Sequence, residues 1–251
     1  MAQDQRKESV NIDLKDPSYV KISNGAHMSY GGSQMWFSPN GADRGSGRLA
    51  GGGCGLVAMA DFFLYWSRQN REQCPGSMRP LLENPEPDKE RYIQYLRILD
   101  RKYLHVLPSV GVTGFQLALA MNLFFLREKL PLRASWKCFL SSPRMLGRMT
   151  ELLQKDLPVI FSVGPNTPWV FGKKSIGMYR LENNGKLKKV DQVSRHYVML
   201  TGIESGPEEG QTLLKISSWG RPYYLDYAEY REYVRKTGDS ITSSMIYIRE
   251  K

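Results

Sequence analysis

Cysteine is scarce in this sequence, and its scarcity excludes several classes of protein. The 251 residues include three cysteines, Cys54, Cys74 and Cys138, which are too few and too scattered for the disulfide framework of a small secreted domain. No Cys-x-x-Cys pair is present to indicate a zinc site, so we expect neither a metal nor another cofactor. A protein of the reducing cytoplasm is the natural expectation.

Long hydrophobic runs are absent as well. The longest runs, residues 56–66 and 117–125, are shorter than the ~18 residues that a membrane span needs. Asp61 and Asn122 interrupt them. The first 19 residues lack the apolar stretch of a secretory signal. We therefore expect no membrane partner.

Acidic residues are outnumbered by basic ones. The 35 Lys and Arg against 25 Asp and Glu give a net charge of 35 − 25, or +10. With 41% hydrophobic and 24% charged residues, the composition is that of a globular protein and excludes disordered, collagen-like and coiled-coil chains. A basic balance is the minimal electrostatic footprint of nucleic-acid binding, which is a second class of hypothesis. Because no zinc finger, RNP-like segment or phosphate-binding glycine loop accompanies the charge, nucleic acid is not the expected partner.

Hydrophobic periodicity indicates helices first and an antiparallel sheet afterwards. Helices are predicted over residues 54–68, 89–99, 113–128, 143–155 and 227–237. Strands are predicted over residues 131–139, 157–163, 176–181, 186–190, 196–203, 213–218 and 244–248. This order predicts an α+β fold.

We expect a single domain with two lobes. A glycine-rich N-terminal segment, residues 1–53, carries short strands near 19–22 and 35–37. A mainly helical lobe follows over residues 54–156, and its first helix is central and mostly buried. A mainly β lobe occupies residues 157–251.

Cys54 has an unusual local sequence for a cysteine. It follows three glycines, precedes Gly55 and stands at the first turn of the apolar helix. Glycines such as Gly53 and Gly55 leave room for a substrate beside the sulfur, so both are expected in the cleft. A helix N-terminus favours thiolate over thiol, and its N–H groups can stabilise an oxyanion. Cys54 is therefore a candidate nucleophile, with a small buried core cysteine as the alternative.

A thiolate needs a base, and three histidines are available. His196 follows a polar stretch and opens a predicted strand, which would hold it rigidly at a sheet edge facing a cleft. It is the candidate base, with a structural histidine as the alternative. His105 lies between apolar neighbours and is expected to pack partly buried, whereas His27 is expected on the surface.

The order of these segments resembles the papain-like cysteine peptidases, and the C-terminal part is especially similar to their bacteriocin-processing branch. A cysteine begins a helix, a histidine opens a strand, and a later strand ends in Ser217-Ser218-Trp219-Gly220. The likeness extends over residues 54–236 as an order of elements. It implies the papain-like fold, with the site in a cleft between a helical and a β lobe.

The resemblance also implies a residue, two positions before the tryptophan, that orients the histidine. Ser217 occupies this position, where the family usually carries Asn or Asp. A serine hydroxyl is shorter and uncharged, so it would hold the imidazole less firmly. An ordinary strand-end serine is the alternative. Trp219 would shield the hydrogen bond.

The family further places a glutamine shortly before the cysteine, and its amide completes the oxyanion hole. Arg48 stands at the usual spacing, and the nearest upstream glutamine is Gln34, twenty residues before Cys54. Gln34 is a candidate if the glycine-rich loop returns it to the cysteine; otherwise it is an ordinary polar loop residue.

These residues predict a cysteine-dependent hydrolase, a peptidase that cleaves a peptide or amide bond through an acyl-enzyme, with a peptide or protein as substrate. Acyl transfer or deamidation by the same pair stays open, because only the acceptor differs. A catalytically weak binding protein is a third alternative, kept open by the serine at position 217.

Overall fold

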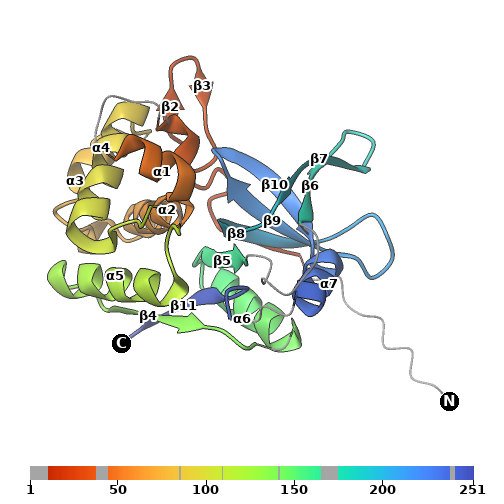
Figure 1. Ribbon diagram of the computed structural model, residues 1–251. Coiled ribbons are helices and arrows are strands. Elements are labelled where there is room, and N and C mark those ends of the chain that lie inside the picture. The colour runs from red at the N-terminus through yellow and green to blue at the C-terminus, as the bar shows by residue number, and fades with distance from the viewer. Residues whose placement is uncertain are drawn as a thin grey trace.

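The protein has an α+β fold, in which helices pack against one large antiparallel sheet (Figure 1). A computed structural model describes residues 11–37, 45–84, 86–108, 110–140, 142–164, 175–237 and 241–251.

Seven α-helices lie in the described part of the chain. They are α1 (Ser46–Gly52), α2 (Cys54–Gln69), α3 (Arg79–Leu82), α4 (Lys89–Leu99), α5 (Gly114–Arg127), α6 (Ser142–Gln154) and α7 (Tyr227–Thr237). Side-chain caps explain where two of them begin. Asp88 accepts a hydrogen bond from the Arg91 N–H at 2.8 Å before α4, and Thr113 accepts one from the Gln116 N–H at 3.2 Å before α5.

Nine strands from the described ranges form the large sheet. They are β1 (Ile12–Asp13), β4 (Leu132–Lys137), β5 (Val159–Val163), β6 (Ile176–Leu181), β7 (Leu187–Val193), β8 (His196–Ser205), β9 (Thr212–Ser218), β10 (Arg221–Asp226) and β11 (Met245–Glu250). The order is β4-β11-β5-β8-β9-β10-β6-β7, and β1 also pairs with β8. Every pairing is antiparallel. Two further strands, β2 (Ser23–Asn24) and β3 (His27–Met28), form a separate hairpin.

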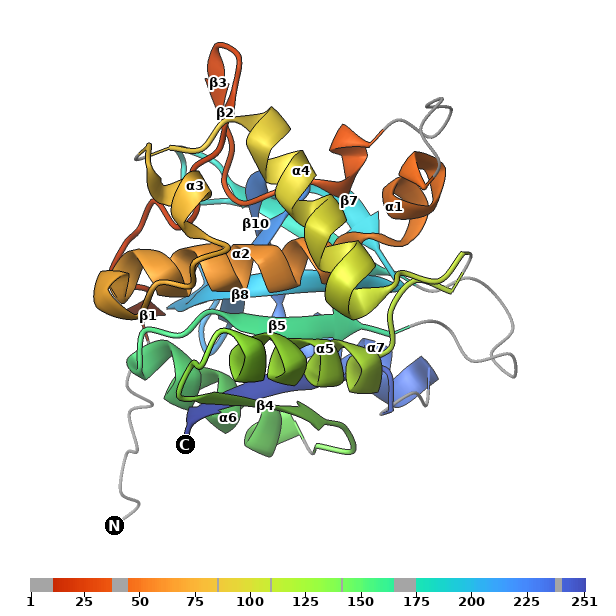
Figure 2. The same ribbon diagram turned by 90° about the vertical axis from the view of Figure 1, so that its left-hand side faces the viewer.

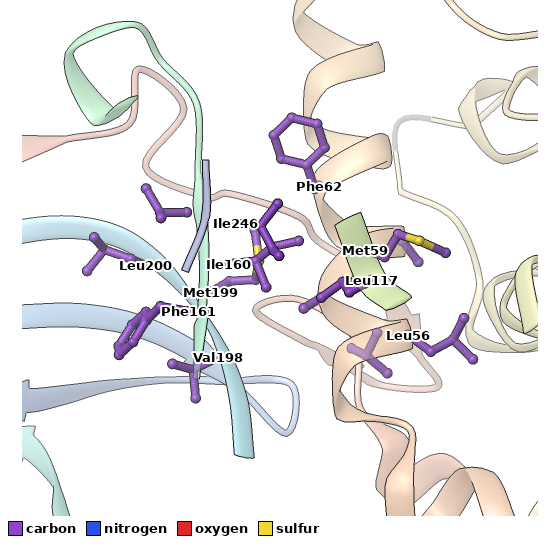
Figure 3. Close-up of a cluster of buried hydrophobic side chains, with 14 of the residues drawn as sticks. Leu56, Met59, Phe62, Leu117, Ile160, Phe161, Val198, Met199, Leu200 and Ile246 are labelled. Carbon is purple, nitrogen blue, oxygen red and sulfur yellow. The ribbon is translucent and has the colours of Figure 1, made fainter. Parts of the chain in front are cut away.

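Helix α2 is the centre of the core. It lies along β8, and α4 crosses it on the side away from the sheet (Figure 2). Leu56, Met59 and Phe62 of α2 are fully buried, and they belong to one hydrophobic cluster with Ile160 of β5 and Met199 of β8 (Figure 3). Each such side chain contributes about 1.5–3 kcal/mol by burial. Because this packing fixes α2 against the sheet, the first residue of α2 has a defined position beside the first residues of β8.

Most predicted elements are confirmed, with shifts of a few residues at their ends. The short strands predicted near 19–22 and 35–37 are wrong. The second is a 3-10 turn, Gln34–Trp36, which forms because the Ser33 hydroxyl accepts the Met35 N–H at 3.2 Å. Helix α1 and strand β10 were not predicted, and β4, from the mainly helical part, joins the sheet through β11.

No single helix in the described part of the chain is long and apolar enough to cross a membrane. Among the described helices, only α1 and α2 together reach that length and composition, and they meet at a bend of 83°.

Candidate active site

Cys54 is the first residue of α2 and follows the bend between the two helices. The bend is made at Gly53, whose N–H donates to the Leu49 carbonyl at 2.9 Å and whose own carbonyl accepts the Val57 N–H at 2.9 Å. A Cβ at Gly53 would overlap the Leu49 carbonyl, so a residue with a side chain does not fit there. The bend leaves the Cys54 side chain partly exposed at the N-terminal end of α2.

Gly53 and Gly55 flank Cys54, and neither is among the described residues that line a cavity beside it. Gly53 and Gly55 are both buried, and a Cβ at Gly55 would lie 3.3 Å from the ring of Tyr197 and from Val112. The prediction that they line the cleft is therefore wrong, because Gly53 packs against Leu49 and Gly55 against Tyr197 and Val112. Gly55 allows β8 to approach the start of α2 closely.

Two opposing effects act on the sulfur of Cys54. Burial raises the pKa of the Cys54 thiol, while hydrogen bonds from the backbone of Tyr197, Gly55 and Cys54 itself lower it. Burial is the larger effect, so the pKa lies above the ordinary value. The helix N-terminus alone does not produce a thiolate, and attack by this sulfur needs a base.

His196 opens β8, as predicted, and is 7% exposed. Its backbone is fixed by the sheet, since β8 lies between β5 and β9 and His196 pairs with Val163. Burial lowers the pKa of His196 from 6.5 to about 4. The imidazole is therefore neutral at pH 7, which is the form that can accept a proton.

Ser218, rather than Ser217, contacts the imidazole. Nε2 of His196 lies 2.8 Å from the Ser218 hydroxyl. The Ser217 hydroxyl instead donates to the Tyr30 carbonyl at 2.7 Å. The expected contact of Ser217 with His196 is thus wrong, because adjacent side chains of β9 point to opposite faces of the sheet.

Trp219 covers the same imidazole. The two ring centroids are 4.9 Å apart with the planes inclined by 31°. Trp219 and Gly220 have φ of 50° and 74° and connect β9 to β10 as a two-residue turn with two positive φ values. A bulky residue rarely adopts positive φ, and such strain is concentrated at functional sites. The predicted position of Trp219 over the histidine is confirmed by the ring contact.

The glycine-rich loop brings Gln34 back to Cys54. Gln34, Cys54 and His196 all line the same small cavity of about 20 Å³. The Gln34 amide donates to the Ala50 carbonyl of α1 at 3.2 Å, which anchors it beside the bend. Sequence spacing alone left open whether the loop makes this return.

Asp61, to which the sequence assigned no role, is a buried carboxyl in the wall of that cavity. It is 1% exposed, accepts the Gly32 N–H at 3.0 and 3.1 Å, and accepts the Tyr92 hydroxyl at 2.5 Å. Burial raises the pKa of Asp61 from 3.8 to about 7, against the opposing effect of these hydrogen bonds. Asp61 therefore ties α2 to the loop two residues before Gln34.

A larger cavity of about 570 Å³ adjoins the small one. Cys54, His196, Gln34 and Tyr197 line both cavities, so the larger space reaches the two candidate catalytic residues. A peptide segment placed there would pass beside the sulfur.

The remaining candidates lie elsewhere. His27 is exposed, as expected, but His105 is exposed rather than packed, because it ends a π-helical turn, Asp100–Leu104, with φ of 54°. Cys74 and Cys138 line neither cavity. Among the residues that the structure describes, no group of three His, Cys, Asp and Glu side chains is arranged to hold a metal ion.

No protein-family model, curated protein or solved structure matches this chain. What the site does must be inferred from its own residues.

Proposed function

We propose that the protein is a papain-like cysteine hydrolase, a peptidase that cleaves peptide or amide bonds through Cys54 and His196. The observation that carries this proposal is that Cys54, His196 and Gln34, from three separate elements, line one cavity. The contacts of His196 with Ser218 and Trp219 give additional support.

The neutral imidazole starts the reaction. In the tautomer that carries its proton on Nε2, His196 donates to the Ser218 hydroxyl 2.8 Å away, and Nδ1 is left as the proton acceptor. Nδ1 takes the proton of the Cys54 thiol as the sulfur attacks the carbonyl carbon of the substrate. Proton transfer during attack suits a thiol whose pKa is raised and an imidazole whose pKa is lowered, because neither group is charged beforehand.

The oxyanion of the tetrahedral intermediate is stabilised by the Cys54 N–H and the Gln34 amide. When the intermediate collapses, the carbon–nitrogen bond breaks and His196 gives its proton to the leaving amine. A thioester on Cys54 remains. Water then attacks the thioester, His196 takes one of its protons, and the acid product leaves with the thiol restored. An amine in place of this water would give acyl transfer.

The residue that would orient His196 here is a serine, Ser218, whereas the papain-like family usually has Asn or Asp in this role. A serine accepts the Nε2–H without charge and so stabilises an imidazolium less than an amide or carboxylate would. We expect turnover to be slower than with Asn or Asp at this position.

Acylation by a small ester tests the proposal without knowledge of the substrate. The protein is incubated with p-nitrophenyl acetate, and acetylated cysteines are mapped by mass spectrometry. Acetylation of Cys54 that is lost in His196→Ala and retained in Cys74→Ala supports the Cys–His pair. Cys54 acetylated no faster than Cys74, or unaffected by His196→Ala, contradicts it. Cleavage of a peptide library by the wild type, but not by Cys54→Ala, then tests peptide hydrolysis.

A further inference from the structure

The larger cavity beside Cys54 contains one charged side chain among its described lining residues. That side chain belongs to Arg195, which directly precedes His196, is exposed and is the one residue with a permanent charge among the described residues that line this cavity. The other described lining residues are glycines, apolar side chains such as Val110 and Ile241, and neutral polar groups. No Asp or Glu is among the described residues that line this space, so none of them neutralises the guanidinium.

Arg195 is exposed, and its guanidinium makes no hydrogen bond or ion pair within the described ranges. This distinguishes it from Arg48, whose guanidinium pairs with Asp100 at 2.6 Å. An unpaired arginine in a concave site is a ready partner for an anion, because its fork of donors matches a carboxylate.

The backbone of Arg195 has a defined conformation. Its φ is 55°, in the left-handed region, and its N–H donates to the Gly164 carbonyl at 3.3 Å. A non-glycine residue in this region is uncommon. Backbone strain of this kind is concentrated at functional sites, and here it lies next to the candidate base.

We propose that Arg195 selects substrates with a carboxylate close to the scissile bond, supplied by an acidic side chain or by a C-terminus. This inference rests on the proposed function for its substrate, but the recognition of a carboxylate can be measured separately. The net charge of +10 acts in the same direction by attracting acidic peptides.

The test uses capped alanine hexapeptides that carry one Glu, Gln or Lys at each position in turn. A further series has alanine only and a free C-terminal carboxylate. Binding to Cys54→Ala is measured by calorimetry, and cleavage by the wild type is measured by mass spectrometry. Arg195→Asn removes the charge, and asparagine tolerates the left-handed backbone, so the turn before His196 is kept. Lys186→Gln, on the exposed β6–β7 turn and outside the cavity, is the matched loss of one charge.

We expect a carboxylate peptide to bind about 10- to 100-fold more tightly than its Gln counterpart. The preference should disappear when Arg195→Asn is added and persist with Lys186→Gln. A preference for internal Glu or for the free terminus identifies the source of the carboxylate.

Other outcomes separate the two proposals. Equal affinity for Glu and Gln peptides, no binding of any carboxylate peptide, or a preference that survives Arg195→Asn overturns the role of Arg195. Carboxylate-selective binding without cleavage or acylation by the wild type overturns the hydrolase proposal and leaves the recognition by Arg195 intact.

Discussion

Nε2 of His196 lies 2.8 Å from the hydroxyl of Ser218, the last residue of β9. The next residue, Trp219, covers the same imidazole with its ring plane tilted by 31°. One hairpin therefore supplies both the hydrogen bond and the cover that fix this ring. With the Ser218 hydroxyl as acceptor, Nε2 carries the proton and Nδ1 is left to take one.

Ser218→Ala and Ser217→Ala should have different effects. Ser218→Ala removes the contact with Nε2 and should slow acylation of Cys54 about 10-fold, the equivalent of one lost hydrogen bond. Ser217→Ala removes the bond to the Tyr30 carbonyl and should lower the free energy of unfolding by about 1 kcal/mol with little effect on acylation. Ester acylation rates and urea unfolding of both variants check this. A larger loss of rate in Ser217→Ala would show that Ser217 orients the histidine after all.

The decline of kcat/KM on the acid side of the pH profile should occur at an unusually low pH. Burial lowers the pKa of His196 to about 4, and the neutral imidazole is the active form. As pH falls, kcat/KM for the ester should therefore stay constant through pH 6.5 and decline only near pH 4. The measurement is kcat/KM between pH 3.5 and 8, with circular dichroism as a control for unfolding. A decline centred on the ordinary histidine value would mean that His196 is solvated or is not the base.

The fold was largely predictable because its signals are local. The apolar run after Cys54 predicted α2, and Asn184-Gly185 predicted the β6–β7 hairpin, whose turn contains Gly185 at φ of 78°. Helix α1 was missed because its glycines conceal its periodicity. The pairing of β4 with β11 joins segments more than 100 residues apart, which no local pattern encodes.

Cys54 and His196 were predictable as candidates because these rare residue types stand in unusual contexts. The choice between Ser217 and Ser218 was not, because a shift of one residue in a strand moves a side chain to the other face. Asp61 could be recognised as a polar residue in an apolar helix. Its partners, Gly32 and Tyr92, are about 30 residues away in each direction and become neighbours only in the fold.

Asp61 should make the protein less stable as pH rises. Its pKa is about 7 in the folded protein and near 3.8 when exposed, so the folded state binds more protons between these values. The free energy of unfolding of the wild type, relative to Asp61→Asn, should therefore fall by a few kcal/mol from pH 4 to pH 7, since a pKa difference of one is worth about 1.4 kcal/mol. Urea titrations of both proteins across this range measure the difference. A difference that is constant with pH would show that Asp61 is ionised throughout.

Gln34→Ala should slow the chemical step. If the amide binds the oxyanion, kcat falls by about 100-fold or more while KM changes little. Met35→Ala, at the next position of the same 3-10 turn, is the matched control because Met35 is 63% exposed. Steady-state kinetics of the two variants distinguish the loss of the Gln34 amide from a general disturbance of the 3-10 turn. Unchanged kcat in Gln34→Ala would mean that the Gln34 amide does not bind the oxyanion and serves only to hold the turn through its hydrogen bond to the Ala50 carbonyl.

Gly31→Ala should disrupt the candidate active site by displacing the residues that pack against Gly31. Gly31 has φ of 81°, and its Cβ would overlap the Ser217 hydroxyl and lie 2.7 Å from Oδ2 of Asp61. Gly25→Ala is the matched control, because Gly25 has φ of 67° with nothing within 4 Å of the added atom. The left-handed backbone alone should lower the free energy of unfolding of each variant by about 1–2 kcal/mol. Overpacking should lower that of Gly31→Ala by ~1–3 kcal/mol more. Gly31→Ala should also lose acylation of Cys54. Urea unfolding and ester acylation of both variants test this. Equal stability and equal acylation in the two would mean that the 30–34 loop adjusts without moving Gln34.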